Sequence, residues 1–296
     1  MKDFEGTFVV AVTPFNKMGE LDVEALKENI DFYVENGVHG IVVTGSTGEF
    51  AALSDEETKK IHETAVEHVN GRVPLIAGTA ACSTKKVIET TSYAKDIGID
   101  GALVVPPFYS KIDDEEIFRH YENISTSVDM PIMLYNNPFT SKIDIKPELI
   151  SKISEIDNIK YVKESSGDIM RIWKILELTK GKMTVFCGAD NLALESFFVG
   201  AKGWICVAAN IFPRETSLLY ELANFEKDYK SALKHYQALL PLYNYLEDTG
   251  KFTHIAKYGL ELRSMKAGLP REPFLPLSED HKEKVEEIIK KIQKMN

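Results

Sequence analysis

Short apolar runs rich in β-branched residues alternate with longer amphipathic stretches along most of the chain. The short runs predict eight strands, at residues 8–15, 39–45, 74–80, 101–107, 131–138, 159–166, 183–190 and 203–210. Apolar residues at helical spacing predict helices between the strands, among them 23–36, 55–69, 84–97 and 115–128. These four helices begin after residues that commonly cap a helix, Asp22, Ser54, Ser83 and Asp113. Ser54 and Glu57 also fit a capping box.

The strand runs are nearly continuous in apolar residues, which is typical of a parallel sheet covered by helices on both faces. Eight strand–helix units of similar length over about 220 residues favour closure into a barrel. An open doubly wound sheet is the competing arrangement. However, no GxGxxG motif follows the first strand, which disfavours a dinucleotide-binding protein of that kind. We therefore expect an α/β fold, a (β/α)8 TIM barrel.

The character of the chain changes after Glu221, because the patterns that follow are helical only, at 226–247, 252–267 and 279–294. A break rich in Gly and Pro at 267–277 separates the last two helices. We therefore expect a catalytic barrel over residues 1–224 and a helical extension packed on it over residues 225–296.

The composition excludes several classes of function. The 45 acidic and 35 basic residues give a formal net charge of −10, which disfavours nucleic acid as a partner. We expect no signal peptide and no membrane span, since no basic region precedes a long apolar run at the N-terminus. Cys82, Cys187 and Cys206 are widely spaced and form no CxxC pair, as in a reducing compartment, and all three are expected to be buried. These features predict a cytoplasmic protein.

The active site of a (β/α)8 barrel is built at the C-terminal ends of its strands. In this chain those ends carry polar residues on most strands, namely Thr13, Ser46, Thr47, Thr79, Tyr109, Tyr135, Asn136, Lys163, Glu164, Asp190 and Asn210. This short set contains the candidates for chemistry.

Lys163 is the most informative of them, because it lies in IKYVKESS, a run typical of a buried strand. If Tyr161 and Lys163 point into the barrel, partial desolvation disfavours the ammonium and leaves more free amine at neutral pH. A free amine attacks a ketone to form an imine, which accepts electrons when a neighbouring bond breaks. A single lysine at a strand end more often extends to solvent, so the interpretation depends on its neighbours.

Neighbouring strands supply the groups that imine chemistry needs. Tyr135 closes the preceding strand, and its phenol can relay protons, although a tyrosine taken alone is more often a core residue. GSTGE at 45–49 follows the second strand, and its backbone N–H groups with the Ser46 and Thr47 hydroxyls suit a carboxylate. The loop lacks the GK[ST] ending of a phosphate-binding P-loop.

A metal-dependent mechanism is disfavoured. None of the 7 histidines lies at the C-terminal end of a predicted strand or forms an HxH or HExxH pair, as zinc would need. Only Glu164 and Asp190 could offer carboxylates at strand ends to magnesium. Cys187 has no histidine at a neighbouring strand end to activate it as a nucleophile. We therefore expect neither a metal nor a cofactor.

Five motifs occur in barrel order: GSTGE after strand two, PPFY after strand four, LYNNP in strand five, VKESSGD in strand six and FCGAD in strand seven. Together they resemble the dihydrodipicolinate synthase / N-acetylneuraminate lyase family over essentially the whole chain. The segments ESSGDIMRI, FCGADNLALE and NIFPRET are similar to a catabolic branch of that family, which includes pyrroline-4-hydroxy-2-carboxylate deaminases and sugar-acid dehydratases and aldolases.

The resemblance implies a class I lyase that needs no cofactor and acts on pyruvate or a longer 2-oxo acid. Lys163 matches the lysine that forms the Schiff base, and Tyr135 matches the tyrosine that relays protons to it. Ser46 and Thr47 match the hydroxyl pair that binds the substrate carboxylate and extends the relay.

The resemblance also implies roles for three further positions. Gly188 and Ile205 match residues that line the pyruvate pocket. Tyr109, in PPFY, matches a tyrosine that family members lend across a dimer interface. A homo-oligomer is therefore implied, commonly a tetramer built as a dimer of dimers.

One position departs from the family pattern. Synthases that condense pyruvate with aspartate semialdehyde carry an arginine shortly after the tyrosine of strand five, whereas Thr140 stands there in YNNPFTSK. Thr140 becomes a candidate for substrate binding, and the nearby Lys142 is a point charge without the bidentate guanidinium. The leading hypothesis is a lysine imine that leads to aldol cleavage or condensation, dehydration or deamination. The alternatives are 4-hydroxy-tetrahydrodipicolinate synthase and a non-catalytic barrel that binds 2-oxo acids.

Overall fold

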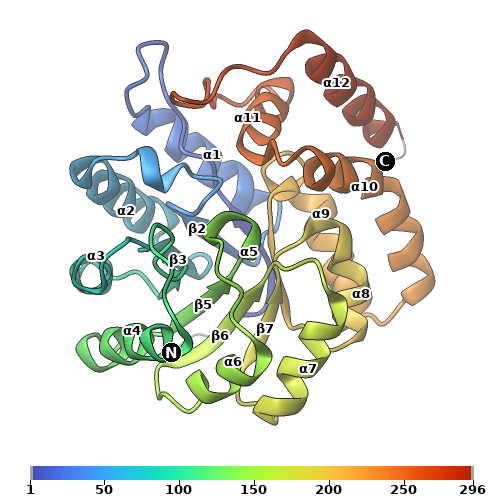
Figure 1. Cartoon of the computed structure of the whole chain (residues 1–296). Coiled ribbons are helices and arrows are strands. Elements are labelled where there is room, and N and C mark those ends of the chain that lie inside the picture. Colours follow the sequence, from blue (N-terminus) through green and yellow to red (C-terminus); the bar gives the residue numbers. More distant parts are fainter. Residues whose placement is uncertain (1–2, 295–296) are drawn as a thin grey trace.

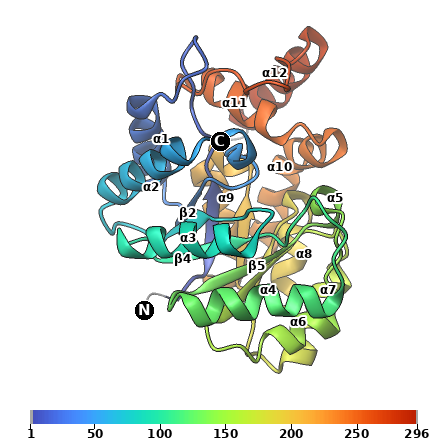
Figure 2. The same cartoon turned by 60° about the vertical axis from the view of Figure 1, so that its left-hand side comes forward.

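The computed structural model describes residues 3–294 (Figures 1 and 2). The strands in this range are β1 Gly6–Val10, β2 Gly40–Val43, β3 Leu75–Gly78, β4 Gly101–Val104, β5 Ile132–Asn136, β6 Ile159–Glu164, β7 Thr184–Cys187 and β8 Gly203–Cys206. The helices are α1 Val23–Glu35, α2 Asp55–Val69, α3 Thr84–Asp96, α4 Asp114–Ser127, α5 Pro138–Ser141, α6 Pro147–Ile153, α7 Ile169–Thr179, α8 Ala193–Phe198, α9 Pro213–Tyr220, α10 Tyr229–Thr249, α11 Phe252–Leu262 and α12 Glu279–Gln293.

The strands form a closed parallel barrel in sequence order, and β1 completes the ring by pairing with β8. The helices surround the strands (Figures 1 and 2). The predicted (β/α)8 barrel is therefore confirmed, as are all eight strand positions. Each predicted strand run extends a few residues past the observed end, because the chain leaves the sheet at the rim. After β2, for example, Thr44 adopts a left-handed backbone conformation with φ 52°.

Aromatic rings fill the barrel interior beneath the C-terminal rim, and glycines on neighbouring strands make room for them. A Cβ atom on Gly40 would lie 2.3 Å from the Phe8 ring, and one on Gly203 would lie 2.1 Å from the Phe186 ring. Tyr161 packs against Phe186, with ring centroids 6.3 Å apart. This alternation of large and absent side chains fills the narrow interior at the density of a protein core.

The four predicted N-caps are confirmed, because each cap side chain accepts a hydrogen bond from a backbone N–H in the first turn of α1, α2, α3 or α4. The capping box of Ser54 and Glu57 is also confirmed. Asp113 and Glu116 form a second capping box that the sequence analysis missed. These caps fix where the helices begin and therefore how the loops at the rim enter them.

The last three helices lie together beside the barrel (Figure 1). The expected helical extension is present, although α11 ends at Leu262 and the prediction to residue 267 was wrong. The Arg263 N–H donates to the Gly259 carbonyl at the end of the helix. The next residue, Ser264, has a left-handed backbone conformation with φ 62°, which ends the helical path. We propose the division at residues 1–224 and 225–296, since a π-helical turn at Glu221–Phe225 leads from α9 toward the extension.

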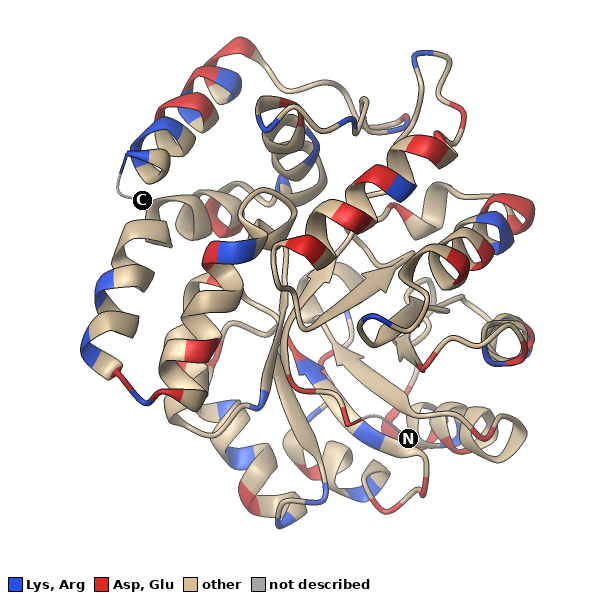
Figure 3. Ribbon diagram, turned by 180° about the vertical axis from the view of Figure 1, so that it is seen from behind, with Lys and Arg blue, Asp and Glu red and all other residues tan. Residues whose placement is uncertain are grey.

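Charged residues are spread over the outer helices, while the barrel strands are largely free of them (Figure 3).

Cys187 and Cys206 are buried as expected, but Cys82 is exposed, so that prediction was wrong. Cys82 lies in the loop after β3, where its side chain is open to solvent. Within residues 3–294, none of the helices combines the length and apolar character that crossing a bilayer requires.

A buried ion pair joins the extension to the barrel. Lys257 in α11 places Nζ 2.7 Å from Glu49 Oε1, and both side chains are about 1% exposed. The same ammonium donates to the Leu269 carbonyl at 3.1 Å and lies 4.2 Å from the centroid of the Phe15 ring. Burial lowers the pKa of Lys257 to about 8, and the charge of Glu49 opposes that shift. Glu49 ends the GSTGE loop, so this pair holds the loop against the extension.

We predict that Lys257→Met lowers the free energy of unfolding by about 3–5 kcal/mol, because it leaves the Glu49 carboxylate buried without its partner. The double variant Glu49→Gln/Lys257→Met should recover most of that loss, since both charges are then absent. Urea unfolding followed by circular dichroism measures the difference. If the single and double variants are equally stable, the pair does not hold the loop through its charges.

Candidate active site

Lys163 lies at the C-terminal end of β6 with its side chain inside the barrel, where 5% of its surface is exposed. Its Nζ atom is 4.3 Å from the centroid of the Tyr135 ring. The two residues are register partners on β5 and β6. The electron-rich face of the ring attracts a positive charge at this distance. The structure thus places an amine and a phenol side by side at the mouth of the barrel.

The Tyr135 phenol oxygen is held by Asn137, whose Nδ2 atom donates to it at 2.8 Å. Asn137 also caps α5, where its Oδ1 atom accepts a hydrogen bond from the Thr140 N–H at 3.3 Å. The sequence analysis assigned no role to this asparagine. Its side chain instead connects the phenol to the helix that carries Thr140, and so orients the proposed proton relay.

Gly188 and Ser165 border the amine. A Cβ atom on Gly188 would lie 2.8 Å from Lys163 Cε and 1.8 Å from Ser165 Oγ, so only glycine fits beside this lysine. Ser165 lies two residues beyond Lys163 and therefore points to the same side of the strand. Its buried hydroxyl has no hydrogen-bond partner among the described residues. A buried hydroxyl without a partner is free to bind a substrate oxygen or a water molecule.

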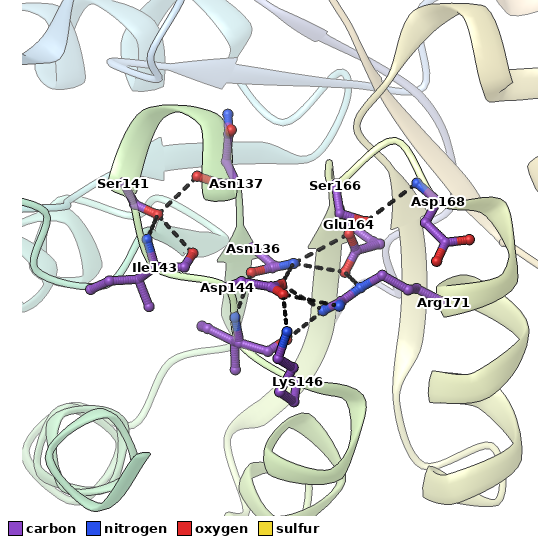
Figure 4. Close-up of polar contacts among 11 residues, drawn as sticks. Asn136, Asn137, Ser141, Ile143, Asp144, Lys146, Glu164, Ser166, Asp168 and Arg171 are labelled. Carbon is purple, nitrogen blue, oxygen red and sulfur yellow. Dashed lines mark hydrogen bonds and ion pairs between the residues drawn. The ribbon is translucent and has the colours of Figure 1, made fainter. Parts of the chain in front are cut away.

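A polar network on the outer side of the barrel fixes the ends of β5 and β6 (Figure 4). Asn136 Nδ2 donates to both carboxylate oxygens of Glu164, at 3.1 and 3.3 Å, and the Ser166 N–H donates to the same carboxylate at 2.7 Å. Arg171 of α7 lies 3.5 Å from Glu164 and 3.0 Å from Asp144. Because these two strand ends are clamped together, the amine and the phenol stay in register.

The GSTGE loop follows β2 at the same rim. Ser46 is exposed and Thr47 is buried. The Thr13 hydroxyl donates to the Gly48 carbonyl at 2.6 Å, and the Thr253 hydroxyl of α11 donates to the Thr47 carbonyl at 3.2 Å. Among the described residues, neither the Ser46 nor the Thr47 hydroxyl is hydrogen-bonded to the amine or the phenol. The loop is therefore fixed through its backbone.

A cavity of about 400 Å³ lies beside the mouth. Four segments line it, namely the GSTGE loop with its following turn, the loop after β4, the helix α5 and the stretch 271–274. Their residues include Ser46, Phe50, Phe108, Thr140, Arg271 and Phe274. Thr140 is exposed on the wall of this cavity. The substrate tail has space here, next to the predicted carboxylate site at Ser46.

The cations near this cavity are already bound to protein groups. Lys142 is exposed and donates from Nζ to the Phe139 carbonyl of its own helix at 2.7 Å. The Arg271 guanidinium forms an ion pair with Glu57 and donates to the Gly19 carbonyl. Neither side chain supplies the free, bidentate cation that a second carboxylate of a substrate would require.

The remaining predicted residues occupy contrasting positions. Ile205 is fully buried in β8 and pairs in register with Phe8. Tyr109, in the loop after β4, is 89% exposed and lies away from the interior of its own barrel. The single chain therefore brings Lys163, Tyr135 and Gly188 together but does not bring Tyr109 to them.

Carboxyl groups gather at the end of β7. Asp190 is fully buried and accepts hydrogen bonds from Trp204 Nε1, the Val207 N–H and the Ala208 N–H, at 3.1, 3.2 and 2.8 Å. Burial raises the pKa of Asp190, and these donors oppose the shift. Burial and the nearby Asp190 charge raise the pKa of Glu247, on α10, to about 7. The sequence analysis did not identify Glu247, because this residue lies 57 positions from Asp190 in the sequence and only the fold brings the two together.

Burial also raises the pKa of the Cys187 thiol to about 12, so the thiol stays protonated and is a poor nucleophile. Within residues 3–294, no group of three or more His, Cys, Asp or Glu residues is arranged to hold a metal ion. The reactive groups at the mouth of the barrel are therefore the Lys163 amine, the Tyr135 phenol and several hydroxyls.

Comparison with known proteins agrees with this fold. The model of the Dihydrodipicolinate synthetase family matches residues 3–292. A 4-hydroxy-tetrahydrodipicolinate synthase of Geotalea uraniireducens is 38% identical over 287 residues, which cover 97% of this chain and 98% of that protein. The solved 4-hydroxy-tetrahydrodipicolinate synthase of Methylacidiphilum fumariolicum SolV superposes with a TM-score of 0.95 at 32% identity, covering 99% of this chain and 97% of its own. A dihydrodipicolinate synthase of Acinetobacter baumannii, solved in complex with pyruvate, gives a TM-score of 0.93 at 34% identity and covers 98% of this chain and 99% of its own.

The fold and the residues at its mouth define the class of protein, a (β/α)8-barrel enzyme. The chain belongs to the dihydrodipicolinate synthetase family. It is an enzyme of the class I lyase type that characterises this family, and its substrates are small molecules. The resemblance that the five sequence motifs indicated is confirmed.

We predict that Gly188→Ala destabilises the fold by about 1–3 kcal/mol, because the added methyl group collides with Ser165 and with the Lys163 side chain. The displaced lysine should also react more slowly with a ketone. The double variant Ser165→Gly/Gly188→Ala removes the closest collision and should regain stability. Thermal unfolding of the three proteins measures the effect, and an unchanged Gly188→Ala variant would contradict the close packing described for this position.

Proposed function

We propose that the chain is a Schiff-base lyase that acts on pyruvate or a longer 2-oxo acid without a cofactor. The observation that carries the proposal is the Lys163 amine, buried inside the barrel mouth with its Nζ atom 4.3 Å from the Tyr135 ring. A second buried lysine, Lys257, is a poor candidate, because its ammonium is engaged by Glu49 and by the Leu269 carbonyl.

The chemistry begins when the neutral Lys163 amine attacks the C2 ketone of the substrate and forms a carbinolamine. Tyr135 carries protons to and from this intermediate, which loses water to give the imine. The substrate carboxylate binds the Ser46 and Thr47 hydroxyls and the backbone of the GSTGE loop. Gly188 and Ile205 line the space occupied by the three pyruvate carbons.

The imine then accepts the electron pair of a bond to C3, either C3–C4 or C3–H. In aldol cleavage the C3–C4 bond breaks, and the C4 hydroxyl loses its proton as C4 becomes an aldehyde. The electron pair of the broken bond forms an enamine across C2 and C3, which is then protonated at C3. Condensation is the reverse of these steps. The same imine supports loss of water or of an amine from the carbon chain, because each leaves through an enamine. Water finally hydrolyses the imine and releases the free lysine.

A 4-hydroxy-tetrahydrodipicolinate synthase is the second candidate. The names of the relatives favour it. The residues of this chain favour it less, since Thr140 stands where such synthases carry an arginine and Lys142 is bound to its own helix. The turnover of pyruvate with aspartate semialdehyde distinguishes the two candidates.

We also propose a homo-oligomer, a dimer of dimers, in which Tyr109 completes the site of a neighbouring copy. An aromatic side chain that is 89% exposed supports this, because a partner subunit would bury it. A cytoplasmic location and the absence of nucleic-acid and membrane partners stay predictions from the sequence.

Subunit mixing tests the shared site. We predict that Tyr109→Phe and Lys163→Ala are each nearly inactive alone but regain about a quarter of wild-type activity when mixed and reassembled. Each mixed dimer then holds one site with both residues intact. Mixtures that stay inactive, although sedimentation shows that they have exchanged subunits, would contradict the role of Tyr109 across an interface.

Trapping tests the imine itself. We predict that borohydride reduction in the presence of pyruvate adds one 1-carboxyethyl group, the reduced form of the pyruvate imine, to the wild-type protein and none to Lys163→Ala, as read by intact mass spectrometry. Lys142→Ala is the matched control and should be labelled like the wild type, because its ammonium binds the Phe139 carbonyl at the surface. An adduct that persists in Lys163→Ala would overturn the mechanism. An adduct without turnover of any 2-oxo acid would support the alternative of a binding protein.

A further inference from the structure

One carboxyl group of the C-terminal extension reaches the rim of the barrel. Glu247, in the last turn of α10, accepts a hydrogen bond through Oε1 from the backbone N–H of Asp190 at 2.9 Å. Asp190 follows β7, two residues after Gly188, which packs against the Lys163 side chain. The Asn191 amide also meets Asn244 of the same helix at 3.3 Å. α10 is therefore seated on the strand end that adjoins the amine.

The two carboxyl groups at this strand end differ in what they can still bind. Both oxygens of Asp190 are used, because Oδ1 accepts from Trp204 and Val207 and Oδ2 accepts from Ala208. Glu247 accepts the Asp190 N–H through Oε1, which leaves Oε2 outside this hydrogen bond. Glu247 is partly buried, and it interacts with the charge of Lys163. The rim thus offers a hydrogen-bond acceptor within the electrostatic reach of the reactive amine.

The charges around the mouth suit one kind of substrate tail. A carboxylate acceptor attracts hydroxyl groups and repels a second carboxylate. Arg271 lines the cavity, but the carboxylate of Glu57 offsets its charge. Thr140 adds a neutral hydroxyl on the cavity wall. The surroundings therefore favour a tail that donates hydrogen bonds and carries no negative charge.

We propose that Glu247 selects the substrate tail, by accepting a hydrogen bond from a hydroxyl group on a 2-oxo acid that has a single carboxylate. The proposal rests on the imine chemistry of Lys163 and adds the class of substrate, a hydroxylated monocarboxylic 2-oxo acid. Glu247 acts as a specificity residue and takes no part in bond breaking. The expected effect of removing its charge therefore lies mainly in KM for hydroxylated substrates.

Three substrates that differ in the tail alone provide the test: 4,5-dihydroxy-2-oxopentanoate, 4-hydroxy-2-oxoglutarate and 4-hydroxy-2-oxopentanoate. Aldol cleavage of each releases pyruvate, together with glycolaldehyde, glyoxylate or acetaldehyde, so one assay of pyruvate serves all three. At a pH above the Glu247 pKa of about 7, where the carboxylate is ionised, we expect wild-type kcat/KM to be higher for the hydroxyl tail than for the carboxylate tail. In Glu247→Gln this preference should fall by about tenfold or more, because a charged hydrogen bond and a repulsion are lost together.

Asp248→Asn is the matched control, since it removes the same charge from an exposed neighbour on the same helix and should keep the wild-type preference. A wild-type enzyme that prefers the carboxylate tail overturns the proposal without any variant. An equal preference in wild type and Glu247→Gln overturns it too, as does the absence of cleavage of all three substrates. Borohydride trapping with pyruvate, which has no tail, separates the two hypotheses. No adduct on the wild type refutes the imine mechanism, whereas an adduct with an unchanged preference refutes tail selection alone.

Discussion

Closure of the parallel sheet is the constraint on which the rest of the structure depends. Each strand pairs with both neighbours, and the pairing of β1 with β8 completes the ring. A closed ring leaves a narrow interior, so Phe8 and Phe186 occupy space that side chains at Gly40 and Gly203 would otherwise take. The filled lower part forces chemistry to the rim, where the carboxyl ends of all strands meet. Lys163 sits at that boundary between the packed interior and the open mouth.

Buried charges then fix the loops that surround the lysine. Glu49 with Lys257 holds the GSTGE loop, Glu164 with Arg171 clamps two strand ends, and a saturated Asp190 shapes the turn after β7. Buried pairs of this kind add little net stability, yet each has a single arrangement that satisfies it. They make the rim rigid, which keeps the amine and the phenol at their observed separation. The helical extension contributes to this rigidity through Lys257.

The fold was predictable from the sequence because strand and helix periods are local, and caps such as Ser54 with Glu57 mark the helix ends. Lys163 and Tyr135 were predictable from their positions at strand ends. Ser165 could have been found from the alternation of side chains after Lys163. Glu247 could not, because no local pattern tells which face of α10 meets the strand end after β7. Cys82 was misplaced because its burial was expected from its residue type alone, whereas it lies in the loop after β3.

The most direct measurement of the central claim is a crystal structure of the protein after reduction with borohydride in the presence of pyruvate. The account predicts continuous density from Lys163 Nζ to C2 of the ligand, with the ligand carboxylate against Ser46 and Thr47 and the Tyr135 hydroxyl close to the new bond. Density that joins pyruvate to Lys257 or to a surface lysine, with Lys163 unmodified, would contradict the assignment of the active site.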